Sequence, residues 1–219
     1  MASFLENIPP VTRNLLYVNV ILFVATLINP AFMQGTFAMA FPLATDFRWW
    51  QPVTHMFMHD GFFHIFFNMY TLVMFGMVVE RVLGTKKFLI LYAITGFGAV
   101  ALHTGVEFLQ VNELLKQYPG TNPQYIYNSI PHVLGASGAV YGVLVAFAML
   151  YPQARMTLLF PPVTLDAKWM VIIFIGIELL TGITGTRMGV AHFAHLGGAL
   201  FGWLTIYIWK KQGKLLRRY

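Results

Sequence analysis

The amino-acid sequence predicts an all-α, polytopic membrane protein with six transmembrane helices. Of its 219 residues, 58% are hydrophobic and only 10% are charged, whereas about a quarter of the residues in a soluble domain are charged. Six apolar stretches have lengths near the ~20 residues that cross a bilayer. Tryptophans lie near the ends of these stretches, which is typical of membrane interfaces: Trp49, Trp50, Trp169, Trp203 and Trp209.

The whole chain, residues 1–219, is predicted to form one bundle. In chain order the helices span residues 14–30, 61–83, 87–110, 136–151, 168–184 and 188–210. Residues 31–60 mix Phe, Met and Trp with prolines and charges, so we expect a segment that lies in the membrane interface. Residues 112–131 and 152–162 carry prolines and polar side chains, which predict polar loops.

The distribution of Lys and Arg predicts the orientation of the bundle. Placing the N-terminus inside leaves only Arg48, Lys116 and Arg187 of the 14 basic residues outside. Residues 1–13 and the basic tail, residues 210–219, are therefore expected in the cytoplasm. The net charge of +6 comes from this inner collar and tail, so it predicts contact with anionic lipids and no nucleic-acid partner. The first residues lack signal-peptide and transit-peptide features, which favours a bacterial plasma membrane.

The fourth predicted helix is too short to cross the whole bilayer. From Ser137 to Tyr151 it rises about 22 Å, less than the ~30 Å of the hydrocarbon layer. Because Arg155 marks its inner end, Ser137 should lie below the outer surface. His195, counted along the sixth helix from Arg187, falls at a depth of about 12 Å. Two separate counts therefore place a serine and a histidine at the same level.

Small residues predict that the fourth and sixth helices approach closely. A Ser-Gly pair alone is more typical of helix packing than of catalysis. However, Gly138 and Gly142 form a small-xxx-small face on the fourth helix, and Gly198 and Gly202 form another on the sixth. Close approach would bring Ser137 within reach of a histidine, and a base at hydrogen-bond distance is what activates a serine hydroxyl.

Three further polar residues are predicted at this level. Tyr141 follows Ser137 by one helical turn and would pack against the imidazole of the base, which has no obvious carboxylate partner. His64 and Asn68 share a face near the outer end of the second helix. They would supply hydrogen bonds to an oxyanion, together with the backbone N–H of Ser137. The alternative is an interface histidine with a packing asparagine.

Other polar side chains leave alternatives open. Five histidines, His55, His59, His64, His192 and His195, are able in principle to converge on zinc. The sequence has no HExxH motif and no cysteine, and Asp60 is the only nearby acid, so we expect neither metal nor cofactor. Glu178 in the fifth helix is an intramembrane acid and a functional candidate, with a simple bond to Thr181 or a backbone carbonyl as the plainer alternative. His103 and Glu107 are expected to pair with each other.

Taken together, these residues resemble the rhomboid family of intramembrane serine proteases. The motifs that carry the resemblance are His59-x4-His64-x3-Asn68, Gly135-Ala136-Ser137-Gly138 followed by Tyr141, and Ala194-His195-x2-Gly198-x3-Gly202. One departure is Glu80-Arg81, where the family has Glu-x-Arg, and this puts an inner ion pair in doubt.

The resemblance implies a catalytic dyad of Ser137 and His195. His64, Asn68 and the Ser137 amide, beside Gly135, would form the oxyanion hole. The sixth helix offers two candidate bases, His192 and His195, and the glycine spacing after His195 favours His195. His192 would then be a polar neighbour one turn nearer the surface. The resemblance also implies that the interfacial segment is the family's lateral loop. The substrates would be transmembrane proteins that enter between the second and fifth helices. They would be cleaved near the outer membrane face.

Two alternatives belong to other functional classes. A catalytically silent rhomboid-like protein would bind membrane clients with the same fold, although the retained polar residues argue against it. A polytopic transporter would be expected to show inverted repeats, which the sequence lacks. The sequence does not predict the oligomeric state.

Overall fold

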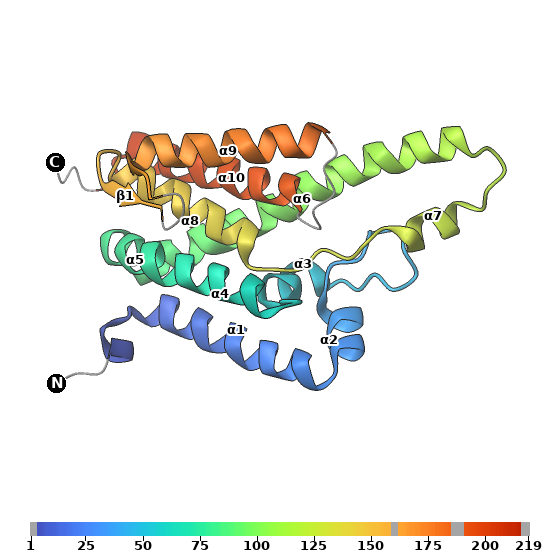
Figure 1. Ribbon diagram of the computed structural model, residues 1–219, viewed down its shortest axis with the longest axis horizontal. Helices are drawn as coiled ribbons and strands as arrows, with labels where there is room; N and C mark the ends of the chain where they lie inside the picture. Colours follow the sequence, from blue (N-terminus) through green and yellow to red (C-terminus); the bar gives the residue numbers. More distant parts are fainter. Residues whose placement is uncertain (1–3, 159–161, 185–190, 216–219) are drawn as a thin grey trace.

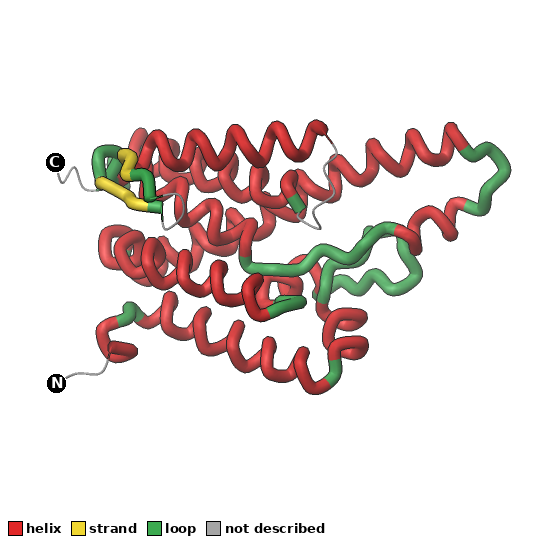
Figure 2. Tube along the Cα trace, viewed as in Figure 1, coloured by secondary structure: helices red, strands yellow, loops and turns green. Residues whose placement is uncertain are grey.

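The structure of the protein is a computed structural model that describes residues 4–158, 162–184 and 191–215. The described chain is a helical bundle with one small hairpin (Figures 1 and 2). The elements in chain order are η1 (Phe4–Asn7), α1 (Pro10–Ile28), α2 (Pro30–Phe37), α3 (Gln51–Thr54), η2 (His55–Phe57), α4 (Phe62–Thr71), η3 (Leu72–Gly76), α5 (Met77–Leu83), α6 (Thr85–Gln117), α7 (Pro123–Ser129), α8 (Ser137–Leu150), β1 (Arg155–Thr157), β2 (Thr164–Asp166), α9 (Ala167–Thr184) and α10 (His192–Lys211).

The predicted all-α membrane fold is confirmed. Four helical segments are long and apolar enough to cross a membrane, namely α1, the continuous α4–η3–α5 segment, α6 and α9. The remaining two predicted spans correspond to α8, with only 14 residues, and α10, with 20. The number of membrane crossings stays a prediction. Arg187 and the first residues predicted for the sixth helix, 188–190, lie outside the described residues.

Two predicted loops contain regular structure, so those predictions were wrong in part. Within residues 112–131, α6 continues to Gln117 and α7 forms after Pro123. The extension of α6 consists of good helix formers, and the Lys116 ammonium lies 2.7 Å from the Glu113 carboxylate one turn away. Within residues 152–162, β1 forms and pairs with β2 as an antiparallel hairpin.

The interfacial segment between α1 and α4 is tied to the chain that leads into α8. Met39 and Val133 exchange two backbone hydrogen bonds of 2.8 and 2.9 Å. The backbone N–H of Gly135 donates to the carbonyl of His55 at 2.9 Å. A small cluster of Phe41, Val111 and Ile126 packs the same segment against α6 and α7. The residues just before Ser137 are therefore held by the interfacial segment.

The centre of the bundle is the contact of α6, α8 and α10, which pack against one another. The two glycine faces meet as predicted. A Cβ added at Gly198 would overlap the carbonyl oxygen of Gly138, and one added at Gly202 would lie 2.7 Å from the carbonyl oxygen of Gly142. The α8 and α10 backbones are thus in direct contact, and only glycine allows this separation.

One end of the bundle collects the start of α1, the α5–α6 junction, the hairpin and the end of α10 (Figure 1). Basic side chains close this end by binding carbonyl groups. The Arg81 guanidinium donates to the carbonyl of Asn7, Lys87 donates to that of Lys214, and Lys210 donates to that of Met149. Arg81, Lys87 and Lys210 are among the basic residues that the sequence predicts on the cytoplasmic side of the membrane.

At this end, Glu80 anchors the first helix. Its carboxylate, 2% exposed, accepts hydrogen bonds from the backbone N–H of Val11 (3.0 Å) and from the backbone N–H and the hydroxyl of Thr12 (both 2.8 Å). The first N–H groups of a helix have no partner within that helix, and they favour a negative charge. Glu80 thus caps α1 from α5.

Replacing Glu80 with alanine should loosen α1. Three hydrogen bonds to a buried carboxylate are lost, which should lower the free energy of unfolding by about 3 kcal/mol. Thermal unfolding of the detergent-solubilised protein, followed by circular dichroism, measures this as a fall in Tm. The matched control is Glu113→Ala, which removes a carboxylate that is 65% exposed and should leave Tm nearly unchanged. Equal Tm values for the two variants would contradict the capping role.

Candidate active site

The structure brings Ser137 and His195 together. Ser137 is the first residue of α8, and His195 lies in the first turn of α10. Their side chains form a hydrogen bond in which the Ser137 Oγ and the His195 Nε2 are 2.8 Å apart. The imidazole is only 8% exposed. This distance follows from the glycine contact between the two helices, which places both first turns at one level.

Tyr141 holds the imidazole from the other side. Its ring stacks on the ring of His195 with centroids 4.4 Å apart and planes 8° apart. Its hydroxyl donates a hydrogen bond of 2.7 Å to the Oε1 of Glu178. The His195 ring is therefore restricted in rotation by packing as well as by hydrogen bonds.

The sequence left the role of Glu178 open, and the structure shows its carboxylate bonded to two histidines of α10. Its Oε1 lies 2.9 Å from the Nδ1 of His195, and its Oε2 lies 2.6 Å from the Nδ1 of His192. The base therefore has a carboxylate partner, and His192 does more than line the site. Depth is consistent with both contacts, since Glu178 lies six residues before the end of α9 and His195 three residues after the start of α10, but depth does not fix the side of α9 that faces them.

His64 and Gly135 lie beside the serine. Gly135 has a φ of +126°, and a Cβ at this position would come within 2.7 Å of the His64 Nε2 and 3.6 Å of the Ser137 Oγ. Glycine therefore leaves the space that the His64 imidazole occupies. The other ring nitrogen of His64, Nδ1, is 2.7 Å from the carboxylate of Asp60. Asn68, one turn further, donates from its amide to the carbonyl of His64 at 2.9 Å.

A second histidine supports His64 from the interfacial segment. His59 is fully buried, and its ring meets that of His64 edge to face at a centroid distance of 4.9 Å. Burial lowers the pKa of His59 to about 4, because a low-dielectric environment disfavours the charged imidazolium. His59 is therefore neutral at pH 7 and contributes packing rather than charge. His103 and Glu107 pair with each other at 3.1 Å, as expected.

Ser137 and His195 open onto a cavity of about 1500 Å³. Its lining comes from α4, α6, α8, α9 and α10, together with the chain that leads into α8. The polar lining includes His64, Asn68, Ser137, Tyr141, His192 and His195. A roomy cavity with several polar partners is able to hold water, which hydrolysis requires.

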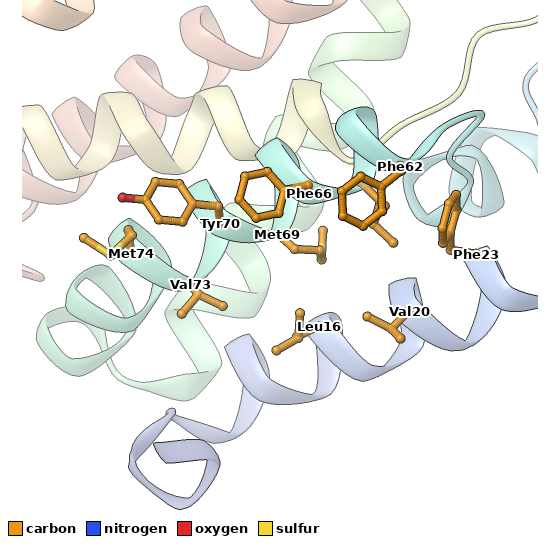
Figure 3. A pocket seen from close by; sticks show the side chains of 10 residues that line it. Leu16, Val20, Phe23, Phe62, Phe66, Met69, Tyr70, Val73 and Met74 are labelled. Carbon is orange, nitrogen blue, oxygen red and sulfur yellow. The ribbon is translucent and has the colours of Figure 1, made fainter. Parts of the chain in front are cut away.

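A second hollow has a different chemical character. It is a groove of about 470 Å³ between α1 and the α4–η3 segment, and its lining is almost entirely apolar (Figure 3). Phe62, Phe66 and Met69 face Leu16 and Val20 across it (Figure 3). Such a surface suits lipid chains and cannot bind water well. The polar cavity at Ser137 is therefore the candidate active site.

Comparison with known proteins identifies the family of the chain. The Rhomboid domain family matches residues 46–212. The rhomboid protease AarA of Providencia stuartii is 28% identical over 75% of this chain and 57% of its own length. The human mitochondrial presenilin-associated rhomboid-like protein is 33% identical over 74% of this chain and 39% of its own length. The chain thus spans about half the length of these relatives. The predicted resemblance to the rhomboid family is confirmed, and the chain belongs to that family.

Proposed function

We propose that the protein is an intramembrane serine endopeptidase that cleaves transmembrane proteins near the outer membrane face. The observation that carries the proposal is the 2.8 Å hydrogen bond between the Ser137 hydroxyl and the His195 Nε2 inside a polar cavity. A serine activated by a neighbouring histidine is the arrangement that nucleophilic hydrolysis needs. Rhomboid family membership supports the same class of reaction.

In the proposed reaction, His195 takes the proton of Ser137 at Nε2 while the Ser137 Oγ attacks the scissile carbonyl carbon. His195 then gives this proton to the leaving amine, and an acyl-enzyme forms. A water molecule, deprotonated by His195, hydrolyses the acyl-enzyme and restores the free serine. The oxyanion would be stabilised by the Ser137 amide at the start of α8, by Asn68, and by His64, whose Nε2 lies beside Gly135 near the serine.

The substrate would be a transmembrane helix that unwinds locally, because an intact helix shields its carbonyl carbons. Access between α4 and α9 is supported by Phe67 and Phe174, which line the cavity from these two segments. The basic residues at the opposite end of the bundle support cytoplasmic termini. We also propose that the protein lies in a bacterial plasma membrane, which a bacterial relative from Providencia stuartii supports.

Labelling with a fluorophosphonate probe tests the proposal directly. The wild-type protein in mild detergent should be labelled covalently, because the probe reacts with activated serines. Ser137→Ala should abolish labelling. Ser129→Ala is the matched control, since the Ser129 hydroxyl only donates to the carbonyl of Ile126, and it should label like wild type. An unlabelled wild-type protein with an unchanged circular dichroism spectrum would overturn the proposal and favour a client-binding protein.

A further inference from the structure

We propose that Glu178 is a positioning residue that extends the Ser137–His195 pair into a serine–histidine–glutamate arrangement. This inference rests on the proposed function. Each link is a hydrogen bond, 2.8 Å from the Ser137 Oγ to the His195 Nε2 and 2.9 Å from the His195 Nδ1 to the Glu178 Oε1. Three different helices, α8, α10 and α9, supply the three side chains.

The carboxylate sets the protonation pattern of the imidazole. A carboxylate oxygen only accepts hydrogen bonds, so His195 must donate its Nδ1–H to Glu178. The neutral ring then has its lone pair on Nε2, which is the nitrogen that faces the Ser137 hydroxyl. In serine hydrolases a buried acid selects the tautomer of the histidine in this way and stabilises the imidazolium that forms during attack.

The orientation of the carboxylate is itself fixed. Its Oε1 also accepts a hydrogen bond of 2.7 Å from the Tyr141 hydroxyl, and its Oε2 lies 2.6 Å from the Nδ1 of His192. The side chain is only 11% exposed. Since an unpaired acid inside a membrane is costly, these contacts stabilise Glu178 at a depth where it would otherwise be unfavourable. They also leave its carboxylate little freedom to turn away from His195.

Glu178 is expected to stabilise the positive charge that forms on His195 during the reaction. When Ser137 attacks, its proton moves to the Nε2 of His195, and the ring becomes positively charged. The ionised Glu178 balances this charge across 2.9 Å without accepting a proton. An amide at the same position preserves the shape of the side chain but removes the negative charge. Glu178→Gln should therefore lower kcat by about 10²- to 10⁴-fold.

The matched control is a second acid that also bonds to a histidine but does not line the cavity. Asp46 pairs with His132 at 2.7 Å, and its side chain is 45% exposed. Asp46→Asn therefore makes the same chemical change without touching the histidine that faces Ser137. It should leave kcat within about threefold of the wild-type value, since surface changes of this kind have small effects.

The experiment measures kcat and KM on a transmembrane substrate, the rate of fluorophosphonate labelling and Tm for wild type, Glu178→Gln and Asp46→Asn. We expect Glu178→Gln to lower kcat and the labelling rate together, with KM and Tm nearly unchanged. Glu178→Ala is then labelled with and without formate, a small carboxylate that is able to enter the polar cavity. Formate should raise the labelling rate at least about tenfold, while chloride at equal ionic strength should not.

The outcomes separate this inference from the proposed function. Labelling of Glu178→Gln at the wild-type rate would overturn the positioning role and leave the serine protease proposal intact. A large fall in Tm of Glu178→Gln, with no effect of formate on Glu178→Ala, would assign Glu178 a structural role and also overturn the inference. If the wild-type protein itself is not labelled, the proposed function fails first.

Discussion

Replacing His195 with alanine is expected to lower kcat for a transmembrane substrate by about 10⁴- to 10⁶-fold. The Nε2 of His195 is the group at 2.8 Å from the Ser137 hydroxyl, and without it the hydroxyl has no base to take its proton. Because a serine and its base act as a unit, removing either should cost about as much as removing both. Cleavage of a fluorescent transmembrane substrate in proteoliposomes measures the effect.

His132→Ala serves as the control for this change. The His132 ring also lines the cavity, but it pairs with the carboxylate of Asp46 at 2.7 Å and not with Ser137, so its loss should leave kcat close to the wild-type value. The prediction would be wrong if His195→Ala cleaved the substrate within tenfold of the wild-type rate while Ser137→Ala did not. That result would require another base, and His192 would be the residue to test next.

Gly198→Ala is expected to separate α8 from α10. The added Cβ would overlap the carbonyl oxygen of Gly138, and because both groups belong to backbones, the helices themselves must move apart. Overpacking of this kind should lower the free energy of unfolding by about 3 kcal/mol or more. A displacement of about 1 Å would also break the Ser137–His195 hydrogen bond and should lower the labelling rate at least about 10²-fold.

Gly176→Ala tests whether this loss belongs to the helix contact. A Cβ at Gly176 on α9 would meet nothing within 4 Å, so Tm should stay the same or rise slightly with the better helix former. Both variants are compared by Tm and by fluorophosphonate labelling. Wild-type Tm and labelling of Gly198→Ala would show that the bundle tolerates separation and would contradict the prediction.

Hydropathy and residue spacing were sufficient to predict the main helices and the meeting of Ser137 with His195. The reason is that a bilayer imposes a length scale, so position along an apolar helix translates into depth. The glycine spacing then predicted the lateral contact between α8 and α10, which brings Ser137 to His195. Tyr141 followed because its position one turn from Ser137 fixed its face.

The role of Glu178 could not be predicted by the same means. Helix α9 is apolar on many sides, with Ile172, Ile177 and Leu180 all largely exposed to the surroundings. A helix without a polar face gives no signal of which side points inward. Depth alone would have paired Glu178 with either histidine of α10, and the rotation of α9 about its axis decides the contact. The helical extension of α6 was missed because packing against Phe41 stabilises a segment whose sequence is polar.

The segment η3 is a π-helical turn that joins α4 and α5 within one candidate membrane span. In an uninterrupted α-helix each residue turns the chain by about 100°, so the faces of α4 and α5 would have a fixed angular relation. The wider turn between Leu72 and Gly76 resets that relation. The α4 half thereby presents His64 beside the serine, while the α5 half presents Glu80 to the first helix. One helical segment can therefore contribute to the candidate active site with one half and anchor α1 with the other.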